Sequence, residues 1–133
     1  MIYCLDTDIC IFALKGRFPS LKRWFQQLSC ARIKIPAIVQ AELFLGAFKS
    51  FNPANAMHLV EGFLEPFEVI PFGAGEAIVY AKVRADLEQS GFLVGPNDLI
   101  IAATVLAHQG TLVTHNVKEF QRVPGLLVED WTR

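Results

Sequence analysis

The sequence predicts an α/β protein whose mostly parallel sheet carries helices on both faces. Short apolar runs alternate along the chain with longer stretches of helical periodicity, which is typical of parallel strands joined by helical crossovers. The 133 residues suit a single domain, residues 1–133. Hydrophobic residues make up 53% and charged residues 19%, which supplies a core without disulfides and excludes a disordered chain.

Five short apolar runs predict the strands, in chain order residues 2–5, 33–35, 68–71, 111–114 and 126–128. Pro36 ends the second run, because proline has no N–H to give to a sheet. Helical stretches lie between these runs, and strands separated in this way pair in parallel with helices covering both faces.

Six stretches of helical character are predicted, in chain order residues 7–15, 20–30, 37–49, 53–64, 76–90 and 97–109. Gly16, Gly91 and Gly110 follow three of them, where glycine favours a helix end. Pro53 begins the fourth, because proline is favoured at the first helical position. The sixth is apolar nearly all round, which predicts a buried helix.

Polar residues follow the first and fourth predicted strands. Asp6 follows the first, and His115 and Asn116 follow the fourth. Open parallel sheets bind their ligands beyond the carboxyl ends of the strands. The sequence therefore predicts a functional site at this edge of the sheet.

Three acidic residues, Asp6, Glu42 and Asp98, are expected to converge at that edge. Each also has a structural interpretation: Asp6 as a helix cap, Asp98 as a first-turn acid behind a cap at Asn97, and Glu42 as a solvated residue. Asp8 suits the first turn of its helix in the same way. Glu42, however, lies beside the apolar stripe of its helix, where burying a carboxylate is costly without a partner.

Taken together, these carboxylates predict a metal site. Like charges a few Å apart repel, and burial adds to that cost. A divalent cation relieves both penalties, and oxygen donors without cysteine or an obligatory histidine favour Mg²⁺ or Mn²⁺ over Zn²⁺. Such an ion suits the hydrolysis of a phosphodiester.

Four motifs resemble those of the PIN-domain ribonucleases, most closely the VapC toxins of bacterial type II toxin–antitoxin pairs. They are M-I-Y-C-L-D-T-D-I-C at the start, V-Q-A-E-L-F-L-G-A around Glu42, G-P-N-D-L-I-I-A-A around Asp98 and L-V-T-H-N-V-K-E-F-Q-R-V-P-G-L near the end. The resemblance spans essentially the whole chain with order and spacing intact. It implies a three-layer α/β/α sandwich and an endoribonuclease that depends on Mg²⁺, for which Mn²⁺ can substitute.

The family's site positions correspond in this chain to Asp6, Glu42, Asp98 and Asn116. The resemblance implies that the three acids hold the metal. The neutral amide of Asn116 departs from a four-acid pattern, because it supplies one oxygen and no charge. Thr7 and Thr114 are candidates to hydrogen-bond the carboxylates or a metal-bound water, with Asp8 supporting them from outside.

The family's pattern also implies a reaction and partners. Water attacks the scissile phosphorus in line, and the products carry a 5′-phosphate and a 3′-hydroxyl. The final stretch, with F-Q-R-V-P-G-L and E-D-W, is similar to the VapC branch that cuts initiator tRNA in its anticodon loop. The resemblance further implies a homodimer and a small VapB-like antitoxin whose tail blocks the site.

A basic segment lies between Asp8 and Glu42 and contains no acidic residue. Its candidates for RNA binding, with aromatic residues interleaved, are Lys15, Arg17, Lys22 and Arg23. One interpretation is a solvated basic face, and the other is a track for RNA phosphates beside the site.

Composition bounds the remaining function classes. The net charge of −1 is not the strongly basic balance of a typical nucleic-acid binder, so any RNA contact must be local. The longest apolar stretch, 99–107, is well short of the roughly 20 residues of a membrane span, and we expect a soluble cytoplasmic protein. The three cysteines have neither metal nor redox spacing and are expected to be buried, reduced thiols.

Two other functions remain open from the sequence. D-T-D after the first strand also resembles the nucleophile pair of haloacid-dehalogenase-like phosphatases, although that function leaves Glu42 without a role. The other is a catalytically inactive PIN-like module that binds RNA or protein. Trapping an aspartyl-phosphate on Asp6 would favour the first, and binding without metal-dependent cleavage would favour the second.

Overall fold

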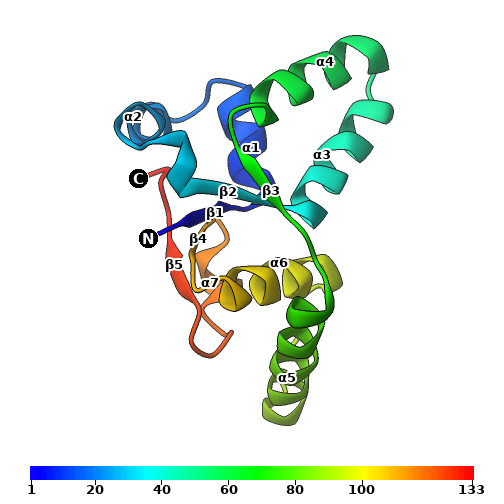
Figure 1. Ribbon diagram of the computed structural model, residues 1–133, viewed down its shortest axis with the longest axis vertical. Coiled ribbons are helices and arrows are strands. Elements are labelled where there is room, and N and C mark those ends of the chain that lie inside the picture. Colours follow the sequence, from blue (N-terminus) through cyan, green and yellow to red (C-terminus); the bar gives the residue numbers. More distant parts are fainter.

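The computed structural model describes residues 1–133 and shows a central sheet between two layers of helices (Figure 1). The five strands are all parallel and lie in the order β3-β2-β1-β4-β5. They are β1 (Tyr3–Leu5), β2 (Ile33–Pro36), β3 (Glu68–Ile70), β4 (Thr111–Val113) and β5 (Leu127–Glu129). The α/β sandwich predicted from the sequence is confirmed, and the sheet is parallel throughout.

The helices divide between the two faces of the sheet. Figure 1 shows one layer above it, made of α1 (Thr7–Leu14), α2 (Pro19–Gln27), α3 (Ala37–Phe48) and α4 (Pro53–Leu64). The layer below consists of α5 (Ala74–Ser90), α6 (Pro96–Ala107) and the short α7 (Val117–Phe120). As its apolar sequence predicts, α6 is the most buried helix.

The strand order creates one crevice. The chain builds β2 and β3 on one side of β1 and then returns to build β4 and β5 on the other. The order therefore reverses between β1 and β4, and the carboxyl ends of the strands at such a point are where α/β proteins bind ligands. Asp6 follows β1 and Thr114 follows β4, so both residues stand at this point.

The helix predicted over 20–30 is too long at its carboxyl end. It stops at Gln27, because Leu28 adopts an extended conformation with φ −97° and ψ 143°. The side chain of Ser29 then caps a separate 3₁₀ helix, η1 (Cys30–Arg32). This turn leaves Cys30 exposed, so the prediction of three buried thiols is wrong, although Cys4 and Cys10 are buried.

Other differences lie at helix starts. α6 begins at Pro96 with Gly95 as its cap, so the cap predicted at Asn97 is wrong. α5 begins two residues earlier than predicted, because the Glu76 side chain accepts a 2.7 Å hydrogen bond from the backbone N–H of Gly73. The sequence did not predict α7, because four residues are too few to show a helical period.

Gly110 connects α6 to β4 where the backbone passes close to β1. A Cβ atom there would lie 3.1 Å from Ile2 Cγ1 and 3.3 Å from Cys4 Sγ. We expect Gly110→Val to lower the free energy of unfolding by about 1–3 kcal/mol through overpacking. Urea denaturation measures the change, and Gly62→Val is the matched control because nothing lies within 4 Å of its Cβ position. Equal losses at both sites would contradict this.

No helix combines the length and the apolar character that crossing a membrane requires.

Candidate active site

Asp6 is both a helix cap and the most buried acid of the site, with 5% of its surface exposed. Its Oδ1 accepts a 2.7 Å hydrogen bond from the backbone N–H of Thr7, which caps α1. Its Oδ2 accepts a 2.7 Å bond from the hydroxyl of Thr114 across the β1–β4 crevice. Burial raises the pKa of Asp6 to about 6, although both hydrogen bonds oppose the shift.

Glu42 reaches the same crevice from α3. Its Oε1 accepts a 2.7 Å hydrogen bond from the hydroxyl of Thr7, the residue next to Asp6. Its Oε2 lies 3.5 Å from the amide nitrogen of Asn97 on α6. Glu42 is therefore tied to both neighbouring helices and is not a freely solvated side chain.

Asp98 enters from the first turn of α6 and faces Glu119 of α7. The pKa of Asp98 is raised to about 7. Burial is the largest cause, and the negative charge of Glu119 and then that of Asp6 are the next largest. The neighbouring carboxyl of Glu119 and the negative charge of Glu42 raise this pKa further. The charges of three other acids, each on a different segment of the chain, thus act on Asp98 at this edge of the sheet.

Glu119 is the site residue that sequence reasoning missed. Its Oε1 accepts a 3.1 Å hydrogen bond from the N–H of Gly95, and its Oε2 accepts a 2.6 Å bond from the side-chain amide of Asn116. The backbone N–H of Asn116 in turn donates to the Thr114 hydroxyl at 3.0 Å. The signal was a glutamate three residues after Asn116, which would reach the same edge through one turn of helix.

The four carboxylates have no cationic partner. Every ion pair in the structure joins other residues, so no lysine or arginine neutralises the cluster. The structure contains no group of three or more acidic, histidine or cysteine side chains arranged to hold a metal ion. The site offers only oxygen donors, and they are negatively charged when ionised. The raised pKa values of Asp6 and Asp98 show that these charges are costly without a partner, and such a donor set fits a hard divalent cation.

The other predicted residues separate in space. Asp8 is exposed and makes no hydrogen bond within the cluster, although its charge contributes to the raised pKa of Asp6. Arg17 and Lys22 line one groove between α1 and α2, together with Phe18 and Phe25. Lys15 lines a different groove, between α1, α3 and α4, and Glu42 is also part of its lining. Arg23 is exposed and lines neither groove.

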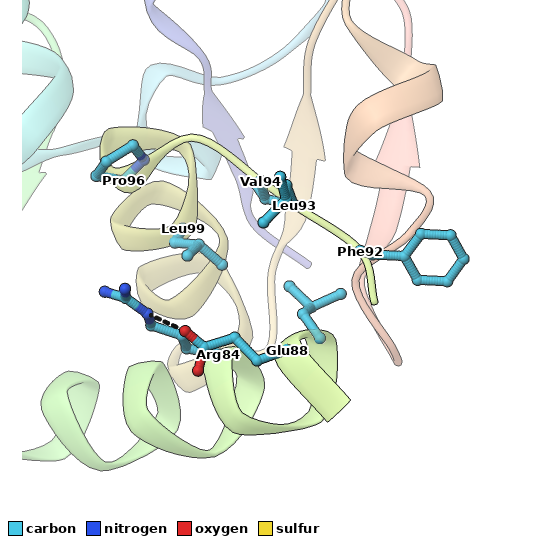
Figure 2. Close-up of a pocket in the computed structure, with 8 residues that line it drawn as sticks. Arg84, Glu88, Phe92, Leu93, Val94, Pro96 and Leu99 are labelled. Carbon is cyan, nitrogen blue, oxygen red and sulfur yellow. Dashed lines mark hydrogen bonds and ion pairs between the residues drawn. The ribbon is translucent and has the colours of Figure 1, made fainter. Parts of the chain in front are cut away.

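A smaller hollow of about 80 Å³ lies between α5 and the loop that leads into α6 (Figure 2). Phe92, Leu93 and Val94 line it from the loop. On the α5 side it is lined by Arg84 and Glu88, which form an ion pair along that helix. None of the four site carboxylates lines this hollow. It belongs to the packing of the segment that delivers Asp98.

The sheet order and the carboxylates at its β1–β4 crevice define a class of protein. The PIN domain family matches residues 3–126, and the chain belongs to this family. PIN-domain ribonucleases as a class depend on a divalent metal, which agrees with the donor set described above.

Within the family, the chain belongs with the VapC ribonucleases. It is 40% identical over 134 residues to Ribonuclease VapC2 of Rickettsia felis, covering 100% of both proteins. It is 37% identical over 129 residues to the tRNA(fMet)-specific endonuclease VapC of Salmonella typhimurium, covering 97% of each. The crystal structure of DNA-bound VapBC from Salmonella typhimurium matches with a TM-score of 0.93 and 37% identity over 98% of both chains.

The match also bears on the alternatives left open by the sequence. It favours the nuclease prediction over the dehalogenase-like phosphatase, in which Glu42 had no role. The hydrogen bond from Thr7 to Glu42 agrees with this, because it makes Glu42 part of the site that contains Asp6.

Proposed function

We propose that this chain is a Mg²⁺-dependent endoribonuclease toxin that cleaves initiator tRNA in its anticodon loop and is restrained by a VapB-like antitoxin. The single observation that carries the proposal is the cluster of Asp6, Glu42, Asp98 and Glu119, which has no cationic partner in the chain. The VapC relatives described above support the reaction, and the name of the Salmonella typhimurium relative supports the RNA target.

In this proposal Asp6 and Asp98 hold the metal, with Glu42 and Glu119 completing the acidic set. When bound, a divalent ion supplies positive charge beside the phosphoryl oxygens and increases the acidity of a bound water. Mn²⁺ has the same preference for oxygen ligands and can replace Mg²⁺.

The neutral side chains of the site position these acids. The hydroxyls of Thr114 and Thr7 donate to Asp6 and Glu42, and each carboxylate keeps further lone pairs with which to bind a cation. Asn116 fixes Glu119 through its amide N–H, so its contribution is to orient a carboxylate and not to add a charge. Burial and repulsion from the other acids raise the pKa of Asp98. A cation bound beside it would offset both effects and favour loss of its proton.

The antitoxin and a second copy of the chain have apolar surface to contact. The groove between α1, α3 and α4 is lined by apolar side chains including Ile11, Leu14 and Leu59, and also by Glu42 of the acidic cluster. An antitoxin segment in this groove would end beside the acidic cluster, where a basic side chain could neutralise it. Leu45 and Phe48 on α3 are 57% and 68% exposed, and such exposed apolar residues suit a homodimer or antitoxin interface.

The test is cleavage of an initiator tRNA transcript by the purified protein with Mg²⁺, followed by sequencing of the RNA ends. We expect one cut in the anticodon loop that leaves a 5′-phosphate and a 3′-hydroxyl, and no cut in the presence of EDTA. Elongator methionine tRNA is the matched control. Cleavage of both tRNAs would overturn the proposed target, and binding without cleavage would favour the inactive-module alternative.

Arg17 and Lys22 are proposed to contact RNA phosphates in the α1–α2 groove. We expect Arg17→Glu to weaken RNA binding and to flatten the slope of log affinity against log salt by roughly 0.7 for each phosphate that is no longer neutralised. Filter binding across a salt series measures both effects. Lys82→Glu on α5 is the control, because this exposed lysine lies in the opposite layer. The same slope for both variants would contradict the proposed track.

A further inference from the structure

His115 lies between two residues that hold the acidic cluster. Thr114, immediately before it, donates to Asp6, and Asn116, immediately after it, donates to Glu119. The His115 side chain is 48% exposed, although it follows a strand whose residues are all buried. Its backbone is therefore fixed at the site while its ring remains open to a ligand.

The ring is held from several sides. The Phe12 ring meets it edge-on at a centroid distance of 5.7 Å, and the Phe18 ring lies at 6.0 Å. Its Nδ1 is 3.0 Å from the Thr132 hydroxyl and 3.4 Å from Asp130 Oδ2. These contacts hold the half-exposed ring in one orientation. A surface side chain without a function would not require such restraint.

Hydrogen-bond counting assigns the protons of this ring. The Thr132 hydroxyl donates its only proton to Asp130 Oδ1 at 2.6 Å, so its oxygen accepts from His115 Nδ1–H. Burial opposes the ionisation of Asp130, but the Thr132 hydrogen bonds, His115 and Arg133 lower its pKa overall, which keeps it an acceptor. With Nδ1 as the donor, Nε2 of the neutral ring is a hydrogen-bond acceptor and has no partner in the protein.

Phe18 connects this histidine to the α1–α2 groove. Its backbone has φ 62° and ψ 97°, a conformation that a bulky residue adopts only at a cost in free energy. Phe18 contacts His115 with its ring and also lines the groove that contains Arg17 and Lys22. His115 therefore directly follows a residue that holds the acidic cluster, and its ring contacts a residue that lines the groove proposed to bind phosphates.

We propose that His115 Nε2 accepts a hydrogen bond from a ribose 2′-hydroxyl beside the scissile phosphate and so selects RNA over DNA. The 2′-hydroxyl is the one proton donor in an RNA backbone, because a phosphodiester has none, and DNA lacks it. The hydrolysis itself does not use this hydroxyl, so discrimination against DNA needs a separate contact. This inference rests on the proposed function, because it names how that site recognises its substrate.

The experiment combines protein variants with substrate variants. RNA substrates carry a single 2′-deoxyribose at each nucleotide around the scissile bond in turn, and KM and kcat are measured for wild type and His115→Ala. In wild type we expect one deoxy position to raise KM by about 5- to 10-fold, the effect of removing one hydrogen bond. In His115→Ala the all-ribose and deoxy substrates should have the same KM, because the contact is already absent.

Two further variants keep the test decisive. His115→Asn retains a donor near Thr132 but lacks Nε2, so it should lose the ribose preference as His115→Ala does. His58→Ala removes an exposed histidine on α4 and should keep the wild-type preference. Thermal melting of each variant identifies loss of folding, which would lower kcat on both substrates alike.

The outcomes separate this inference from the proposed function. If His115→Ala and His115→Asn keep the wild-type difference between ribose and deoxyribose at every position, the 2′-hydroxyl contact is wrong while the ribonuclease proposal stands. Equal weakening of ribose and deoxyribose substrates would also overturn it, since that is the result of a phosphate contact or a structural role. Failure of the wild type to cleave RNA at all would overturn both.

Discussion

Replacing Asp98 with asparagine is expected to reduce Mg²⁺-dependent RNA cleavage by at least about 100-fold. Electrostatic groups at a reacting phosphate contribute roughly this much or more when they are removed singly. The substitution keeps the size of the side chain and its place in the first turn of α6, but it removes a negative charge from the proposed metal site. Asp6→Asn should have an effect of the same size for the same reason.

Single-turnover cleavage of initiator tRNA over a Mg²⁺ titration measures this loss. Asp86→Asn is the matched control, because Asp86 is an exposed aspartate on α5 and its loss should leave the rate unchanged. Glu119→Gln tests the fourth acid of the site, which only the structure identified. We expect this variant to cleave more slowly than wild type, and the difference in rate should be smaller at high Mg²⁺ concentration. Full activity of Asp98→Asn or Asp6→Asn would rule out the proposed metal site.

The second large effect is on stability in the absence of metal. Burial raises the pKa of Asp6 from 3.8 to about 6, so the folded protein holds this proton more tightly than the unfolded chain does. Between about pH 4 and about pH 6 the unfolded state therefore loses the proton first, and the free energy of unfolding falls as pH rises. At about 1.36 kcal/mol for each pKa unit, Asp6 contributes a fall of up to about 3 kcal/mol.

Asp98 extends this fall to about pH 7, but more weakly, because water screens its half-exposed carboxyl. Urea unfolding in EDTA across this pH range measures the effect. Asp6→Asn lacks the Asp6 titration, so its stability relative to wild type should increase as pH rises. Mg²⁺ should restore the wild type above pH 7 and have little effect on Asp6→Asn. A stability difference that stays constant with pH would show that Asp6 acts only as a cap.

The strands and most helices follow from local pattern, because apolar periodicity and residues such as Gly16 and Pro53 act over a few neighbours. The starts of α5 and α6 did not follow, since a side-chain hydrogen bond from Glu76 and a glycine cap at Gly95 decided them. The carboxyl end of α2 was also set by backbone conformation at Leu28, which no periodicity in the sequence indicates.

The candidate site divides in the same way. Asp6, Glu42 and Asp98 could be proposed from the sequence because each is an acid next to an apolar segment, and strand ends in parallel sheets gather at one edge. Their partners could not be proposed with the same detail. The Thr7–Glu42 and Thr114–Asp6 bonds join residues 35 and 108 positions apart, so they exist only once the strand order β2-β1-β4 is formed.

The sequence by itself determined the fold class, the family and the type of chemistry, because these depend on residue types in a linear order. Only the tertiary structure showed that Glu119 belongs with these acids and that Asn116 donates a hydrogen bond to it. It also placed Lys15 in a different groove from Arg17 and Lys22. It also placed His115 between Phe18 and Thr132. The physical reason is that such contacts depend on how segments far apart in the sequence pack together. Local sequence patterns do not specify the distances between those segments.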